Sequence, residues 1–132
     1  MIPDTKNAQV VGLYLEAMQT DDVETVLRLS IPEAPLEYPG GRRFENVTDL
    51  LAWSHGRHSF VRHNIERVDE IAVGRTATLY VSGTLHGDLT GKESFAGVRF
   101  IYRFILKDGL VAETVLWSDM ADFLRQRASK SA

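Results

Sequence analysis

The stretch FIYRFILKDGLVAETVLWSD (residues 100–119) decides the fold, because it has the pattern of a β-hairpin. Apolar and polar side chains alternate along 95–106 and 110–118, as in strands with one buried face. Lys107-Asp108-Gly109 supplies the turn, since Asp-Gly tolerates the positive φ angles of a tight hairpin. We expect the aromatic face of the first strand to point inward and the other face outward. The inward set is Val98, Phe100, Tyr102 and Phe104, and the outward set is Arg99, Ile101, Arg103 and Ile105.

Earlier segments extend this hairpin into a sheet. Residues 76–86 alternate in the same way, and 65–73 predict one more strand. On the strand 76–86 we expect an inward face of Leu79, Val81, Gly83 and Leu85. Residues 87–94 (GDLTGKES) lack the spacing of a phosphate-binding loop and are interpreted as a hairpin loop.

The first half of the chain predicts three helices. Asp4 is expected to cap the first, and Asp21 with Glu24 resembles a capping box for the second. Pro32 forbids continuation of that helix, and Asn46 is expected to cap the third. Three helices followed by an antiparallel sheet predict an α+β fold. At 132 residues we expect a single domain over 1–127 and a disordered tail over 128–132.

Composition narrows the classes of function. The chain has no cysteine, which excludes disulfides and thiolate chemistry. A net charge of −3 gives no basic field for nucleic acid, and no apolar run is long enough to cross a membrane. The N-terminus does not have the pattern of a signal peptide, so we expect a cytoplasmic protein.

Several motifs, in this order and spacing, resemble the nuclear transport factor 2 superfamily, in particular its SnoaL-like and ketosteroid-isomerase-like branches. The resemblance covers nearly the whole chain. It implies a cone in which helices close one side of a strongly curved, mixed or antiparallel sheet around an apolar pocket. The motifs are LYLEAMQTDDVETVLRLS (13–30), PLEYPGG (35–41), NVTDLLAW (46–53) and the hairpin 100–119.

The resemblance also argues against steroid isomerisation. Tyr14 matches a hydrogen-bonding tyrosine of the ketosteroid isomerases, but its usual tyrosine partners match Ser30 and Ser54. The two catalytic aspartates of those enzymes match Tyr38 and Phe100, and phenylalanine can neither donate a hydrogen bond nor titrate. We interpret Tyr38 as a wall or core aromatic and the following Pro-Gly-Gly as a turn.

Two carboxylates remain candidates for proton transfer beside Tyr14. Glu113 shares a face with Val115 and Trp117, which we place inward. The alternative is a strand of reversed parity with a solvated Glu113. Asp119 lies at the rim of the cone, where the resemblance places an acid, or it caps a short C-terminal turn over 120–126. The predicted ligand contacts are Tyr38, Trp53, Val81, Phe100, Tyr102 and Trp117.

Three histidines, His55, His58 and His63, lie close together in the sequence. Arginines interleave with them and no carboxylate has ligand spacing, so we expect no metal site. They form either a solvated basic helix end or a region that steers anionic ligands.

The sequence and the resemblance leave two alternative functions. One is a metal-free, cofactor-independent acid–base enzyme (isomerase, cyclase or hydrolase type) acting on a small apolar or aromatic molecule. The other is a non-catalytic dimeric module that binds a ligand or a protein. In both we expect a homodimer through the outer sheet face, which carries Tyr80, Ile101, Ile105 and Leu116 in this assignment.

Overall fold

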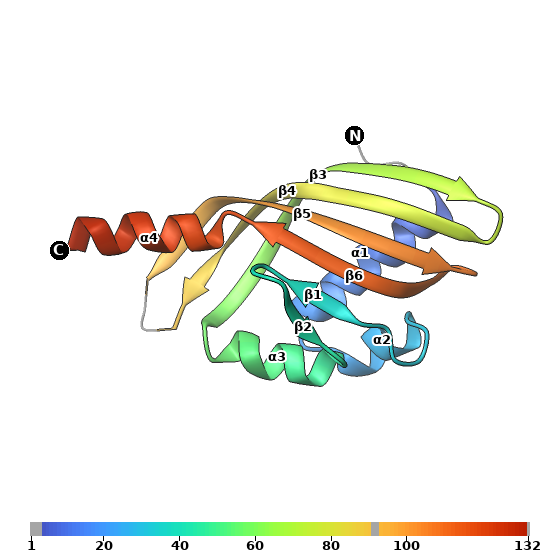
Figure 1. Cartoon of the computed structure of the whole chain (residues 1–132), viewed down its shortest axis with the longest axis horizontal. Helices are drawn as coiled ribbons and strands as arrows, with labels where there is room; N and C mark the ends of the chain where they lie inside the picture. The colour runs from blue at the N-terminus through green and yellow to red at the C-terminus, as the bar shows by residue number, and fades with distance from the viewer. Residues whose placement is uncertain (1–3, 91–92, 132) are drawn as a thin grey trace.

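A curved, mixed six-stranded sheet is the framework of the molecule, with strand order β2-β1-β6-β5-β4-β3 (Figure 1). The computed structural model describes residues 4–90 and 93–131. The strands are β1 (Leu36–Tyr38), β2 (Arg42–Phe44), β3 (His58–Val73), β4 (Thr76–Leu89), β5 (Ser94–Lys107) and β6 (Leu110–Ser118), and the helices are α1 (Lys6–Gln19), α2 (Val23–Arg28), α3 (Val47–His55) and α4 (Met120–Ser131). The predicted α+β class is confirmed, and its strands 76–86, 95–106 and 110–118 correspond to β4, β5 and β6.

The inner face of the sheet is built by β4 and β5. The side chains predicted to face inward on these strands are buried, and Phe104, Leu79 and Val81 are fully enclosed. The alternation in the sequence therefore identified this face correctly, because a period of two leaves only one way to bury all the rings.

Two glycines let β3 pass very close to β4. A Cβ on Gly83 would lie 1.9 Å from the backbone oxygen of Asn64, and one on Gly87 would lie 2.1 Å from that of Phe60. The β3–β4 register also shifts between Ile65 and Arg67. Bulges and close glycine contacts bend strands, and they account for the curvature of this half of the sheet.

Helices α1, α2 and α3 lie on one side of the curved sheet (Figure 1). Their N-terminal caps are Thr5, Asp22 and Asn46, each accepting a bond from a backbone N–H of the first turn. The predicted cap at Asn46 is confirmed. The predicted caps Asp4 and Asp21 were each wrong by one residue. Asp21 instead has a positive φ of 58° in the turn between α1 and α2.

The motif PLEYPGG forms a tight hairpin. Strands β1 and β2 pair antiparallel, and the turn between them contains Gly40 and Gly41 at φ angles of 86° and 74°. Glycine adopts this region without steric cost, which explains the two consecutive glycines. Strand β1 also pairs in parallel with β6, where Leu36 lies opposite Thr114. The N-terminal third of the chain is thereby joined to the last strand.

Helix α4 projects away from the sheet at the end of the chain (Figure 1). It continues to Ser131, where we expected a tail from residue 128. Its first turns contact β5 through the rings of Phe123 and Phe95. Within residues 4–90 and 93–131, no helix is both long and apolar enough to span a membrane.

Candidate functional site

A cavity of about 270 Å³ lies between the inner face of the sheet and the helices. The end of α1, the β1–β2 turn, α3, the start of α4 and strands β3 to β6 all contribute to its wall. Most of the wall is apolar, and none of the lining residues is an aspartate or glutamate. The apolar residues include Met18, Leu50, Leu51, Val61, Leu85, Leu116 and Met120.

Four polar side chains form a hydrogen-bonded chain along this wall. Gln19 Oε1 lies 2.8 Å from His63 Nδ1, and His63 Nε2 lies 3.1 Å from the Tyr102 hydroxyl. The Tyr102 and Tyr38 hydroxyls are 3.3 Å apart. These residues come from α1, β3, β5 and β1, so the chain connects four elements that are distant in the sequence.

The direction of these bonds follows from one backbone contact. The N–H of His63 donates to Gln19 Oε1 at 2.6 Å, which identifies that amide atom as oxygen. An oxygen there can only accept, so His63 must carry its proton on Nδ1. Nε2 is then an acceptor and the Tyr102 O–H points to it, which leaves the Tyr38 O–H to point to Tyr102. Each hydroxyl proton is therefore directed toward His63, and the tyrosine oxygens remain able to accept a bond from a ligand.

Burial keeps every member of this chain neutral near pH 7. Desolvation, together with smaller effects of the nearby His86 and Arg62, lowers the pKa of His63 from 6.5 to about 4. Desolvation also raises the pKa values of Tyr38 and Tyr102 far above their ordinary value. The site therefore presents a neutral imidazole acceptor and two protonated phenols in an apolar cavity.

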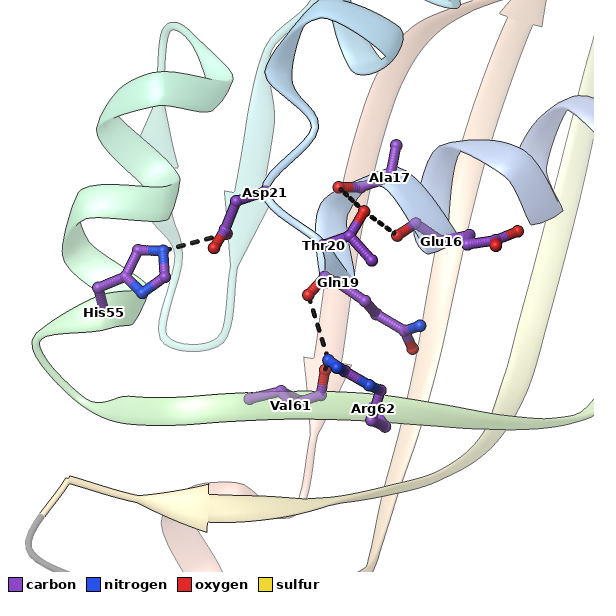
Figure 2. A network of polar contacts seen from close by, with 8 residues as sticks. All are labelled: Glu16, Ala17, Gln19, Thr20, Asp21, His55, Val61 and Arg62. Atoms are coloured by element: carbon purple, nitrogen blue, oxygen red, sulfur yellow. Dashed lines mark hydrogen bonds and ion pairs between the residues drawn. The ribbon is translucent and has the colours of Figure 1, made fainter.

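Helix α1 holds Gln19 in place through contacts at its C-terminal end (Figure 2). Arg62 Nη1 donates to the backbone oxygen of Gln19 at 3.1 Å. A cation there stabilises the helix terminus and satisfies one of its last carbonyls. His55 Nε2 lies 3.0 Å from the Asp21 carboxylate, so α3 is joined to the turn that follows α1 (Figure 2).

Rings at the mouth of the cavity complete the site. Tyr38 packs edge-on against Trp53, with ring centroids 6.1 Å apart. Two guanidinium groups lie over the Trp53 ring, at 5.2 Å for Arg42 and 4.7 Å for Arg57. Arg57 is also part of the cavity wall.

The structure brings together some of the predicted site residues. Tyr38, Trp53 and Tyr102 lie in the cavity wall. Phe100 and Val81 are buried on the same inner face but are not among the lining residues, and Phe100 supports His63 at a ring distance of 5.3 Å.

Tyr14 lies deeper in the core, away from the cavity. Its hydroxyl accepts a bond from Thr114 Oγ1 at 3.3 Å, and its ring packs edge-on against Phe104. Desolvation raises its pKa. Tyr14 also borders a second hollow of about 630 Å³ between α1, α2 and the start of α3. We favour the smaller cavity as the site because the His63 chain and most of the rings face it.

The prediction that Glu113 and Trp117 face inward was wrong. Counted from the two-residue turn at 108–109, Glu113 would lie opposite Phe104, but a register shift leaves Ala112 as an extra residue and places Glu113 opposite Ile105. Glu113 is therefore on the outer face, where its carboxylate lies 2.9 Å from Arg103. Trp117 is 47% exposed on the same face. Thr114, Leu116 and Ser118 face inward instead, which also removes Leu116 from the predicted outer set.

Asp119 does not line the cavity either. Its carboxylate is paired with Arg99 Nε at 2.6 Å, and its side chain is 45% exposed. Its role in proton transfer stays a prediction.

His55 and His63 have different surroundings. His55 ends α3 and pairs with Asp21, whereas His63 lies in β3 and lines the cavity. The side chain of His58 lies outside the described part of the structure. No group of histidine, aspartate and glutamate side chains that could hold a metal ion occurs in the described parts of the chain. Sequence reasoning did not predict His63, Gln19 and Arg57 as cavity residues. For His63 the cause was a predicted strand that began at residue 65, whereas β3 begins at His58. An earlier start would have revealed His63, which pairs with the inward-facing Leu85.

The architecture and cavity described above define the NTF2-like fold, and the chain has that fold. No family model matches the sequence, and no curated protein matches it. Three solved structures illustrate the likeness.

An NTF2-like protein of unknown function from Burkholderia pseudomallei is 17% identical, with a TM-score of 0.71 over 92% of this chain and 96% of that one. TerC, crystallised with polyporic acid, is 14% identical, with a TM-score of 0.73 over 92% and 97%. IdmH from Streptomyces antibioticus, a candidate polyketide cyclase, is 16% identical, with a TM-score of 0.69 over 94% and 99%. At these identities the likeness establishes the fold, and function has to be argued from the site.

Proposed function

We propose that the protein binds a small apolar or aromatic molecule in this cavity and catalyses proton transfer on it without a cofactor. The observation that carries the proposal is the directed chain from Tyr38 through Tyr102 to His63. An apolar cavity with a few convergent polar groups is the usual form of a small-molecule site. The ligand-bound TerC and the candidate cyclase IdmH, which share the fold, support the same class of function.

The chain is arranged to withdraw a proton from the ligand. A ligand O–H or acidic C–H donates to a tyrosine oxygen, and the tyrosine passes its own proton toward His63 Nε2. The relay leaves the tyrosines unchanged, the imidazole protonated and the ligand as an enolate or phenolate. Returning the proton to another atom of the ligand completes an isomerisation or cyclisation. The low pKa of His63 means that it gives the proton back readily.

The absence of an acid from the cavity wall favours a second candidate function. Without a carboxylate to stabilise the imidazolium, the same site can serve as a ligand-binding module that does no chemistry. The fold allows both functions, since one fold hosts binders and enzymes alike.

A proton-exchange measurement separates these functions. We expect the protein to accelerate exchange of the α-hydrogens of tetralone, a small bicyclic aromatic ketone, in deuterated water, followed by proton NMR. Tyr102→Phe preserves the ring but breaks the relay, and it should slow this exchange about a hundredfold, the usual scale for loss of general acid–base assistance. Glu113→Gln is the control, because Glu113 faces away from the cavity.

The other outcomes are equally informative. Binding of the ketone without faster exchange would favour the non-catalytic module. Equal exchange rates for the parent and Tyr102→Phe proteins would refute the relay.

We also propose that the protein acts as a homodimer in the cytoplasm and binds neither nucleic acid nor membranes. The outer sheet face carries an apolar cross-strand pair, Ile101 and Trp117, and both are partly exposed. Burial of this pair against a second copy would remove apolar surface from water. The net charge of −3 argues against a nucleic-acid partner.

A further inference from the structure

The mouth of the cavity carries positive charge that no carboxylate of the described chain neutralises. Arg42 and Arg57 both lie over Trp53, and neither has an ion-pair partner among residues 4–90 and 93–131. Four acids of the surrounding elements are paired with other side chains. Glu45 lies beside Arg43, Asp21 beside His55, Asp119 beside Arg99 and Asp122 beside Arg125.

Packing alone does not explain this arrangement. One guanidinium over an indole gains cation–π energy, but a second on the same ring adds repulsion between two cations. An anion bound at the mouth would relieve that repulsion. Arginine suits this task because its planar fork matches the two oxygens of a carboxylate.

The cavity therefore offers two kinds of polar group to a ligand. The tyrosine oxygens of the His63 chain accept a bond from a hydroxyl. Most of the wall is apolar, Arg57 is part of it, and Arg42 lies over the same Trp53 ring without lining the cavity. Among the described residues, none that lines the cavity is an acid that would repel an anion.

We propose that the ligand is an aromatic hydroxy acid, with its carboxylate on Arg57 and Arg42, its ring against Trp53, and its hydroxyl on the Tyr38–Tyr102 pair. This inference rests on the proposed binding function of the cavity and specifies the class of molecule bound there. The carboxylate contributes binding and orientation, while proton transfer takes place at the hydroxyl end.

A matched pair of probes tests the inference. One probe is a hydroxynaphthoic acid with its two groups at opposite ends of the ring system, and the other is its neutral primary carboxamide. Titration calorimetry at low salt should show the acid binding about tenfold more tightly than the amide, the scale of one charge-assisted contact at a partly exposed site. Added salt should weaken binding of the acid but not binding of the amide.

Variants identify the side chain whose charge produces the preference for the acid. Arg57→Gln should remove most of the preference for the acid, because it weakens binding of the acid far more than binding of the amide. Arg57→Lys should retain part of the preference, since it keeps the charge but loses the planar fork. Arg75→Gln is the control, because it removes the same charge from the β3–β4 turn, where Arg75 pairs with Asp108.

The outcomes separate the two proposals. If acid and amide bind equally and Arg57→Gln changes neither, the anionic ligand class is overturned while the binding cavity stands. If neither probe binds the parent protein, the cavity proposal and this inference both fail. A preference for the acid that Arg57→Gln does not reduce would also overturn the inference.

Discussion

His63 depends on Gln19 for its chemistry, although the two residues are distant in the sequence. Gln19 Oε1 accepts from both the backbone N–H and Nδ1 of His63. One oxygen therefore fixes the position of the strand and the tautomer of the ring together. Replacing Gln19 by glutamate would keep the shape but add a charge beside the imidazole, which would raise the pKa of His63.

The low pKa of His63 predicts a pH dependence of stability. Unfolded, the ring takes up a proton near pH 6.5, but in the fold it resists protonation down to about pH 4. The contribution of neutral His63 is therefore fully present above pH 6.5 and is lost as pH falls toward 4, by roughly 3 kcal/mol in total.

Urea unfolding at a series of pH values checks this prediction. Between neutral pH and about pH 4, the free energy of unfolding of His63→Leu should decline less steeply than that of the parent protein, because leucine does not titrate. The carboxylates titrate in both proteins, so their effect cancels in the comparison. Identical slopes would mean that His63 is not buried in its neutral form.

At the scale of elements, the bend between β3 and β4 depends on Gly83. An added Cβ would overlap the backbone oxygen of Asn64 at 1.9 Å, and backbone cannot yield as a flexible side chain can. We expect Gly83→Ala to destabilise the fold by about 3 kcal/mol or more, as other steric conflicts in packed interiors do. Thermal unfolding measures the change.

Gly12 provides the matched control. It lies inside helix α1, and a Cβ there would meet no atom within 4 Å. Gly12→Ala should therefore stabilise the protein by up to about 1 kcal/mol, because alanine favours the helix. If both substitutions had the same effect, the close approach of β3 to β4 would not be what requires Gly83.

Elements with regular alternation could be predicted from the sequence, and interrupted ones could not. The inner faces of β4 and β5 followed from their rings and branched residues, but one extra residue at Ala112 reversed the face of Glu113. A bulge leaves no strong mark in the sequence, because alanine suits either face. The cavity chain was harder still, since Gln19, His63, Tyr102 and Tyr38 meet only through tertiary structure.

At the scale of the whole molecule, the outer sheet face predicts self-association. Ile101 is 38% exposed and Trp117 is 47% exposed, and they pair across β5 and β6. We expect Trp117→Lys to shift the protein from dimer to monomer in sedimentation velocity at micromolar concentration, because the charge would be buried at the interface. Leu13→Lys, at an exposed position of helix α1, should leave the dimer intact. A monomeric parent protein would contradict the proposal.

The parallel pairing of β1 with β6 also has a consequence for biosynthesis. Leu36 finds its partner Thr114 only in β6, which is made much later than β1. Until the ribosome has made β6, the β1–β2 hairpin has no sheet edge to join, and the wall that carries Tyr38 cannot close. A ligand therefore has no complete cavity to enter before β6 has been synthesised.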